Sequence, residues 1–230
     1  HLSKNTTFTL TASTFWSKWN ASGQIPDRAV ADGSIGFYGA IDPNEGGQTS
    51  RTNFNAELLT LTARNHVWKN QLFYSNYNFE LYSNFTFFLE DPINGDQIRQ
   101  KEGRHILGYN SNYSIAHGLL HKQATFTIGL NYRHDFTQNS ELSHTKNRID
   151  LLNAIKLGDV NEANIGLYAD ETIQLSPKLS TTFGLRFDYF NNQYVDKLQN
   201  NTLFTEKAAI LSPKLNLYYT HNKNLQFYLT

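Results

Sequence analysis

The stretch that decides the fold is YSNYNFELYSNFTFFLED, from Tyr74 to Asp91. Read at every second residue, it separates into two sets with different chemistry. One set is mostly aromatic and aliphatic, and the other is rich in amides. Alternation of this kind is typical of a β-strand whose two faces meet different environments. The sequence therefore predicts one long strand that covers about residues 70–90.

The composition of the chain limits its class. It has 230 residues, no Cys, 13 Tyr, 16 Phe and a formal net charge of zero. A balanced charge gives no indication of a nucleic-acid partner, and the absence of Cys excludes disulfides and thiolate metal sites. No apolar run approaches the ~20 residues of a membrane helix. A polar average with many aromatic residues is typical of a transmembrane β-barrel, because only alternate residues meet lipid.

The same alternation recurs along the whole chain. Nine strands are predicted, at about residues 5–17, 51–64, 70–90, 104–116, 123–134, 162–174, 179–191, 206–219 and 224–230. Long loops are expected at about residues 18–50, 90–103, 135–161 and 191–205. Short turns are expected at about residues 65–69, 117–121, 175–178 and 220–223. Short turns on one side of the sheet and long loops on the other are typical of outer-membrane barrels.

A closed barrel suits the hydrocarbon core of a membrane, because it pairs every backbone N–H and C=O without leaving an edge. Crossing that core takes only ~9–11 tilted residues. We expect apolar residues of three strands to face lipid: Phe73, Tyr77, Phe79, Leu81, Phe85, Phe87, Phe126, Ile128, Leu130, Phe183, Leu185 and Phe187. We expect a polar set to face the lumen: Asn76, Asn78, Glu80, Arg186 and Asp188.

The predicted fold class is therefore all-β, an antiparallel transmembrane β-barrel. Bacterial single-chain barrels have even strand numbers, whereas about nine strands are visible and the last residues, 225–230, still alternate. We therefore expect part of a larger barrel. A soluble or surface β-sandwich that binds carbohydrate is the alternative, because its half-buried strands alternate too. An outer-membrane barrel enzyme is a third possibility, although no G-x-S-x-G or H-E-x-x-H motif is present.

Four segments resemble the TonB-dependent receptors of the bacterial outer membrane. Residues 22–51 (SGQIPDRAVADGSIGFYGAIDPNEGGQTSR) are similar to a first long outer loop, and residues 81–100 (LYSNFTFFLEDPINGDQIRQ) to a strand and its loop. Residues 160–190 and 210–230 are similar to strand–turn–strand units. The resemblance covers nearly the whole chain. It implies that residues 1–230 are part of the β-barrel domain of such a receptor, located in the bacterial outer membrane.

The resemblance also implies a function. Receptors of this kind import scarce, bulky solutes, above all ferric siderophores and other metal chelates, and they are transporters rather than enzymes. The implied partners are outer-membrane lipid, the protein TonB acting through a plug domain, a small-molecule ligand and surface lipoproteins. The family's N-terminal plug has no counterpart in this sequence, so we expect the barrel wall and loops only. Phe37 stands where many relatives carry Arg, and the ligand chemistry of those relatives is therefore not carried over.

Aromatic residues in the long loops are the candidate ligand contacts, because aromatic rings bury much area at a low entropy cost. They are Trp19, Phe37, Tyr38 and Tyr194, together with His134 at the edge of a long loop. Packing of the loops against one another is the alternative role of these rings. No catalytic residue, metal site or cofactor is predicted. His117 and His121 flank a short turn, where their spacing has the wrong geometry for a metal.

Overall fold

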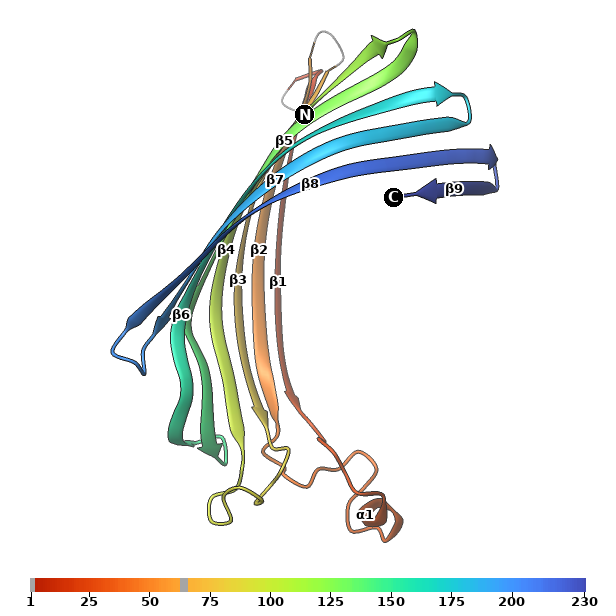
Figure 1. Cartoon of the computed structure of the whole chain (residues 1–230). Coiled ribbons are helices and arrows are strands. Elements are labelled where there is room, and N and C mark those ends of the chain that lie inside the picture. The colour runs from red at the N-terminus through yellow and green to blue at the C-terminus, as the bar shows by residue number, and fades with distance from the viewer. Residues whose placement is uncertain (1–2, 63–65) are drawn as a thin grey trace.

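The computed structural model describes residues 3–62 and 66–230, and nearly all of them belong to one curved sheet (Figure 1). The described residues form nine strands and one short helix, α1 (Asp27–Ala31). The strands are β1 (Thr6–Asn20), β2 (Gly46–Leu61), β3 (Val67–Ser83), β4 (Ile98–Leu119), β5 (Lys122–Lys146), β6 (Asp150–Ser176), β7 (Leu179–Asp196), β8 (Thr202–Asn222) and β9 (Leu225–Leu229). Each strand pairs in antiparallel fashion with its neighbours in the chain. The prediction of nine antiparallel strands is confirmed.

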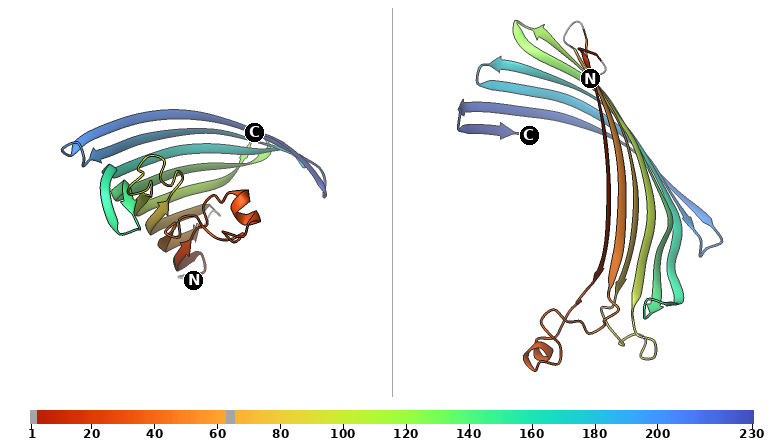
Figure 2. Two further views of the ribbon diagram at one scale, coloured as in Figure 1. Left: turned by 90° about the horizontal axis from the view of Figure 1, so that it is seen from below. Right: turned by 180° about the vertical axis from the view of Figure 1, so that it is seen from behind.

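The sheet twists and bends so that it has a convex and a concave face (Figure 2). In the part of the chain that the structure describes, all nine strands lie in this one sheet, ordered β1 to β9. A sandwich needs two packed sheets. The alternative of a β-sandwich is therefore wrong.

The connectors at one end of the sheet differ from the prediction. Loops at 21–45 and 84–97 overlap the first two expected long loops, with shifted bounds. The expected loops at 135–161 and 191–205 are wrong, because β5 and β6 continue to a tight turn at 147–149, and β7 and β8 to a short turn at 197–201. Three register shifts between 137 and 145 interrupt the alternation that would have revealed the longer strands. The expected turn at 65–69 lies partly outside the described residues.

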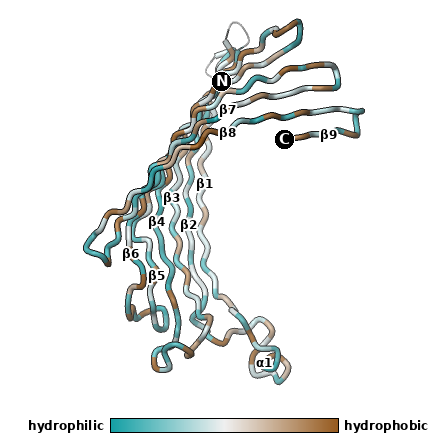
Figure 3. The backbone as a smooth tube through the Cα atoms, in the orientation of Figure 1, coloured by the Kyte–Doolittle hydropathy of each residue, from teal (hydrophilic) through white to brown (hydrophobic). Residues whose placement is uncertain are grey.

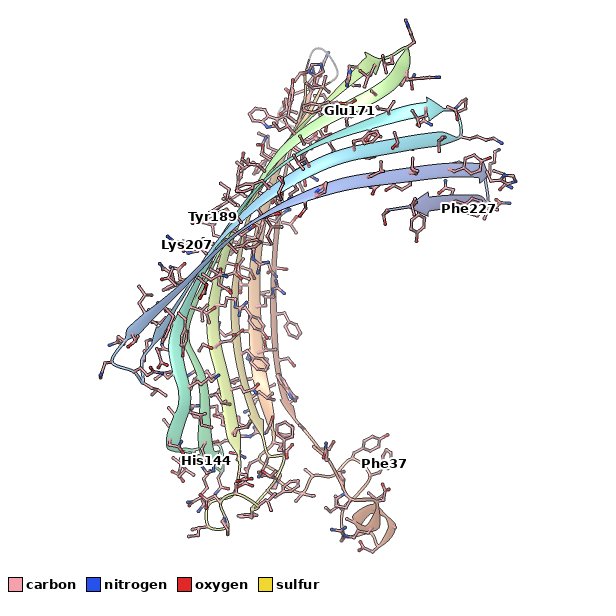
Figure 4. The ribbon with its side chains drawn as sticks, in the orientation of Figure 1. Phe37, His144, Glu171, Tyr189, Lys207 and Phe227 are labelled. Atoms are coloured by element: carbon pink, nitrogen blue, oxygen red, sulfur yellow. The ribbon has the colours of Figure 1, made fainter. Side chains whose placement is uncertain are left out.

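The register shows which residues share the convex face. Figure 4 places Tyr189 on that side of the ribbon. One continuous row of paired residues crosses eight strands through Tyr189, and it is uncharged throughout: Leu10, Ala56, Leu72, Tyr109, Tyr132, Ile165, Tyr189 and Ala209. By the same register, Phe126, Ile128, Leu130, Phe183, Leu185 and Phe187 lie on the same face. We call these residues the convex band; Leu185, for example, is 50% exposed.

The adjacent row has the opposite chemistry and lies on the concave face. It consists of Thr9, Glu57, Gln71, Asn110, Asn131, Gly166, Asp188 and Ile210. Side chains connect across strands here. The Arg186 Nη1 donates to Asn131 Oδ1 at 2.8 Å, across Gly166 of the strand between them, which has no side chain. Figure 3 shows the resulting alternation of polar and apolar residues along the strands.

The register divides the residues that were predicted to face lipid. On β3, Phe73, Tyr77, Phe79 and Leu81 lie on the concave face, together with Arg186 and Asp188 of β7. The expected lumen residues Asn76, Asn78 and Glu80 lie on the convex face, as Phe183 and Phe187 do. The prediction of one shared face for each set is therefore wrong for β3.

Position along the strand gives the physical reason for this reversal. Up to Tyr74 the convex residues of β3 are Trp68, Leu72 and Tyr74, apart from Asn70. Beyond Tyr74 they are Asn76, Asn78, Glu80 and the buried Tyr82. An outward strand face becomes polar where it rises out of an apolar band into water. The predicted alternation was correct, but the faces were assigned from the part of β3 that lies beyond the band.

Phe85 and Phe87 are also placed differently from the prediction. β3 ends at Ser83, so both residues lie in the loop 84–97, where period-2 alternation no longer assigns a face. Phe87 has a positive φ of 60°, which is incompatible with a continuing strand. The strand therefore ends about halfway through the stretch from Tyr74 to Asp91.

Candidate functional site

A large hollow opens on the concave face, near the end of the sheet that carries the long loops. We call it the inner hollow, and it has a volume of about 930 Å³. Its apolar lining is Tyr77, Phe79, Leu142, Ile155, Tyr194 and Phe204, from strands β3 to β8. Its polar lining is Gln100, Lys101, Glu102, Ser140, Glu141, Lys156, Asp196 and Gln199.

Two pairs of stacked aromatic rings flank the inner hollow. Tyr77 and Phe79 on β3 stack with ring centroids 6.3 Å apart, and Tyr194 on β7 and Phe204 on β8 stack at the same distance. The curvature of the sheet brings these pairs to one space, although three strands separate β3 from β7. Such an arrangement offers two flat apolar walls to a bulky ligand.

Glycine positions make room for aromatic rings on the sheet. A Cβ atom at Gly158 on β6 would collide with the ring of Tyr194, which lies over that position from the neighbouring strand. Gly129 leaves space for Tyr168 in the same way. An aromatic ring that covers a strand glycine restores packing that the glycine lacks. The orientation of Tyr194 is therefore set by the sequence of two strands.

Charged groups elsewhere on the concave face are paired with one another. Asp135, which is only 4% exposed, accepts two hydrogen bonds of 2.7 Å from Arg133 and lies 3.7 Å from Arg104. Arg186 and Asp188 make the same bidentate pair, at 2.6 and 2.7 Å. The partners of each bidentate pair are two residues apart on one strand, so both share the concave face. These pairs leave the middle of the concave face polar without a large surplus of charge.

A side-chain cluster ties the loops together at the end of the sheet. The Arg148 guanidinium donates to the carbonyl oxygens of Asn44 and Glu45, and the Arg148 backbone N–H donates to Gln97 Oε1 at 2.9 Å. Gln97 Nε2 in turn donates to Asp42 Oδ2 at 3.2 Å. The loops 21–45 and 84–97 and the turn at 147–149 are thus joined into one unit, which we call the loop cap.

The loop cap holds two acids with opposite behaviour. Glu45 is only 5% exposed, and burial raises the pKa of its carboxyl group, with the nearby charge of Asp42 adding to the effect. In the loop 84–97, the backbone N–H groups of Leu89, Glu90 and Asp91 all donate to the Asp96 carboxylate. Glu45 therefore takes up a proton at a higher pH than an ordinary glutamate, whereas Asp96 is stabilised as a carboxylate.

The structure places the predicted ligand contacts in different environments. Tyr194 lines the inner hollow, but from β7 rather than from a loop. Phe37 and Tyr38 lie in the loop 21–45, pack edge to face at 5.0 Å, and are 73% and 90% exposed. Figure 4 shows Phe37 in this loop, beyond the end of the sheet. Trp19 lies at the end of β1 with its ring beside Gly47.

His134 lies away from the inner hollow. It belongs to β5, on the convex face, and its Nε2 is 2.6 Å from Asn161 Oδ1. Three rings of the inner hollow were not predicted, because Tyr77 and Phe79 were assigned to lipid and Phe204 was not singled out. The available signal was the length of the aromatic run beyond Tyr74, which exceeds what a membrane crossing needs.

Two absences concern the described residues alone. Within 3–62 and 66–230, no group of three His, Asp or Glu side chains is placed to hold a metal ion. None of the helices in those ranges is long and apolar enough to cross a membrane.

The fold and its two faces are those of a β-barrel wall, and comparison with known proteins agrees. The sequence matches the profile of the family "TonB dependent receptor-like, beta-barrel" over residues 2–230. The chain therefore belongs to the TonB-dependent receptor β-barrel family. No curated protein matches the sequence.

Solved structures share the fold at low sequence identity. The ferric citrate transporter FecA in its unliganded form has a TM-score of 0.81 at 14% identity, covering 96% of this chain and 32% of that one. The ferripyoverdine receptor of Pseudomonas aeruginosa has a TM-score of 0.68 at 12% identity, and the match covers 96% of this chain and 32% of the receptor. The alcaligin receptor FauA of Bordetella pertussis has a TM-score of 0.67 at 10% identity, and the match covers 97% of this chain and 32% of FauA. The chain thus spans about a third of the length of these proteins.

Proposed function

We propose that the chain supplies wall and outer loops to an outer-membrane receptor that imports a bulky nutrient, above all a ferric siderophore or another metal chelate. The observation that carries the proposal is the inner hollow with its two aromatic walls. Family membership supports a transporter rather than an enzyme. Three proteins of the same fold are named for ferric citrate, ferripyoverdine and alcaligin.

The convex band supports the placement in a membrane. Crossing the hydrocarbon core takes ~9–11 residues, and the apolar residues from Phe183 to Tyr189 lie within a strand of 18 residues. Trp68 and Tyr189, both on the convex face, suit the interfaces between lipid and water. With the convex band in the membrane, the loops 21–45 and 84–97 lie outside the cell.

The lining of the inner hollow suggests how a chelate is held. Two Lys and three acidic residues line it, so charge alone does not select an anionic ligand. The rings supply the larger share of the binding free energy, because each buries a wide apolar surface. In the proposed mechanism, the loop cap positions the rim, the rings capture the ligand, and TonB drives its passage through the barrel. Surface lipoproteins are further candidate partners.

The test uses the native protein extracted from its membrane. Phe79→Ala and Tyr194→Ala are expected to weaken binding of a radiolabelled ferric chelate by about tenfold each, which is roughly 1.4 kcal/mol. Phe15→Ala is the matched control, because it removes an exposed aromatic ring from the concave side of β1, outside the inner hollow. Unchanged chelate binding in both hollow variants would refute the proposed site.

A further inference from the structure

A second hollow involves the convex face, and it shares Phe79, Lys101 and Glu102 with the lining of the inner hollow. We call it the outer groove, and its volume is about 470 Å³. The register aligns five of its lining residues in one row across five strands: Trp16, Ser50, Asn78, Gly103 and Gln138. The outer groove therefore runs across the strands of the sheet rather than along them.

The two neighbouring rows form its sides. His105 lines it on the side of the convex band, and Gln48, Glu80 and Lys101 line it on the side of the loops. The register of β4 and β5 shifts between Lys101 and Gly103, which interrupts the sheet surface at one end of the groove.

Gly103 keeps the outer groove open. A Cβ atom there would meet Asn78 Oδ1 at 3.3 Å, so a larger side chain would occupy the space between Asn78 and Gln138. The backbone does not require glycine at this position, because the φ of Gly103 is not positive. The missing side chain thus shapes a surface rather than a turn.

The polar groups of the outer groove are held in place. Gln48 Nε2 donates to Glu80 Oε2 at 2.8 Å, and Asn78 Nδ2 donates to Asn76 Oδ1 at 3.0 Å. These contacts fix the direction of the amide and carboxylate groups that a ligand would meet. Trp16 adds a broad apolar ring that is 67% exposed.

We propose that the outer groove binds a neutral saccharide. A pyranose ring presents C–H groups on its face, which pack on an aromatic ring such as Trp16, and hydroxyl groups on its rim, which bond to amides and carboxylates. Glu80 and Glu102 line the groove beside Lys101, so it has no cationic surplus that would favour a phosphate. An apolar ligand would use none of the hydrogen-bonding positions that the side chains of Gln48 and Asn78 still have free after these contacts.

The position of the groove indicates the source of the saccharide, and this step rests on the proposed function. Asn78 follows Tyr74 by four residues, which places the groove about 13 Å further along the strand from the aromatic end of the convex band. In the proposed orientation this is the level of the sugar head groups of outer-leaflet glycolipids. A free oligosaccharide from the medium has the same chemistry and is the other source.

The experiment compares Gly103→Leu and Trp16→Ala with the native protein purified in detergent. Gly118→Leu is the matched control, because Gly118 lies on the same strand as Gly103 and a Cβ there meets nothing within 4 Å. The probe is the oligosaccharide released by mild acid from the glycolipid of the same membrane, and its binding is measured by calorimetry. Retained glycolipid is measured in parallel by native mass spectrometry, and circular dichroism confirms that each variant keeps its β-structure.

Both groove variants are expected to weaken oligosaccharide binding at least tenfold, while Gly118→Leu binds as the unchanged protein does. Loss of retained glycolipid in the same variants identifies the membrane as the source, and unchanged glycolipid identifies a free oligosaccharide. Equal binding in all proteins, or none in any, overturns the proposal. Binding of a ferric chelate is recorded on the same samples, so that failure of the outer groove is distinguishable from failure of the import function.

Discussion

Replacing Arg148 tests whether the loop cap is one mechanical unit. Its guanidinium donates to the carbonyl oxygens of Asn44 and Glu45, and lies 5.5 Å from the centre of the Tyr82 ring. Hydrogen bonds from a charged donor contribute about 1.5–3 kcal/mol each. Because Arg148 is only partly buried, we count roughly 1–1.5 kcal/mol for each of the two bonds, and expect Arg148→Ala to weaken docking of the loop 21–45 by about 2–3 kcal/mol.

Amide hydrogen exchange measures this docking directly. The Ala21 N–H donates to the Glu45 carbonyl oxygen at 3.0 Å, and it becomes exchangeable when the loop opens. A loss of about 2–3 kcal/mol accelerates exchange by roughly 30-fold to 140-fold. Arg28→Ala, which removes the same charge from α1 of the same loop, is the control. Acceleration below about threefold in Arg148→Ala, or equal acceleration in both variants, would refute the reasoning.

Three further predictions concern the membrane, a loop acid and a strand glycine. Leu211→Arg on the convex face is expected to lower the free energy of unfolding in lipid by ~2–4 kcal/mol, measured by urea unfolding from vesicles. Ile210→Arg, which pairs with Asp188 on the concave face, should lower it much less. Equal losses in the two variants would contradict the lipid-facing assignment. Burial raises the pKa of Asp96 and backbone N–H groups lower it, with a net pKa below the usual value. The Asp96 carboxylate therefore stabilises the loop 84–97 fully at pH values above the ordinary aspartate pKa, and this contribution is lost as the pH falls through the lower pKa of the folded protein. Protease cleavage of the loop should rise over that acidic range, and Asp96→Asn should abolish this pH dependence. Gly158→Leu displaces the Tyr194 ring and should weaken chelate binding about tenfold, with unchanged binding as the contrary result.

Much of the fold could be predicted because period-2 alternation is a local property. It predicted the number of strands. It also predicted that Phe183, Leu185 and Phe187 lie on one face of their strand and Arg186 and Asp188 on the other, and the register agrees. The same rule reversed the faces of β3, because alternation shows that two faces differ but not which environment each one meets. Where a strand extends beyond an apolar band, its outward face meets water, and the aromatic residues of that part of the strand can lie on the inward face instead.

The parts that escaped prediction depend on contacts between distant residues. Register shifts between 137 and 145 hid the outer halves of β5 and β6. The contact between Arg148 and Asn44 joins positions 104 residues apart, and no local pattern signals it. The inner hollow exists because curvature brings Tyr77 near Tyr194, which alternation within one strand does not reveal.

The uninterrupted order of the sheet, from β1 to β9, has a consequence for assembly. Every strand pairs with its neighbours in the chain, so the entropy lost on forming each hairpin depends mainly on its own connector. That loss is small where a tight turn joins the strands, as at 147–149, and largest at 21–45, which separates β1 from β2. Hairpins in the second half of the chain therefore close at a lower entropic cost than the β1–β2 pair, and the long first loop slows the pairing of β1 relative to the other strands.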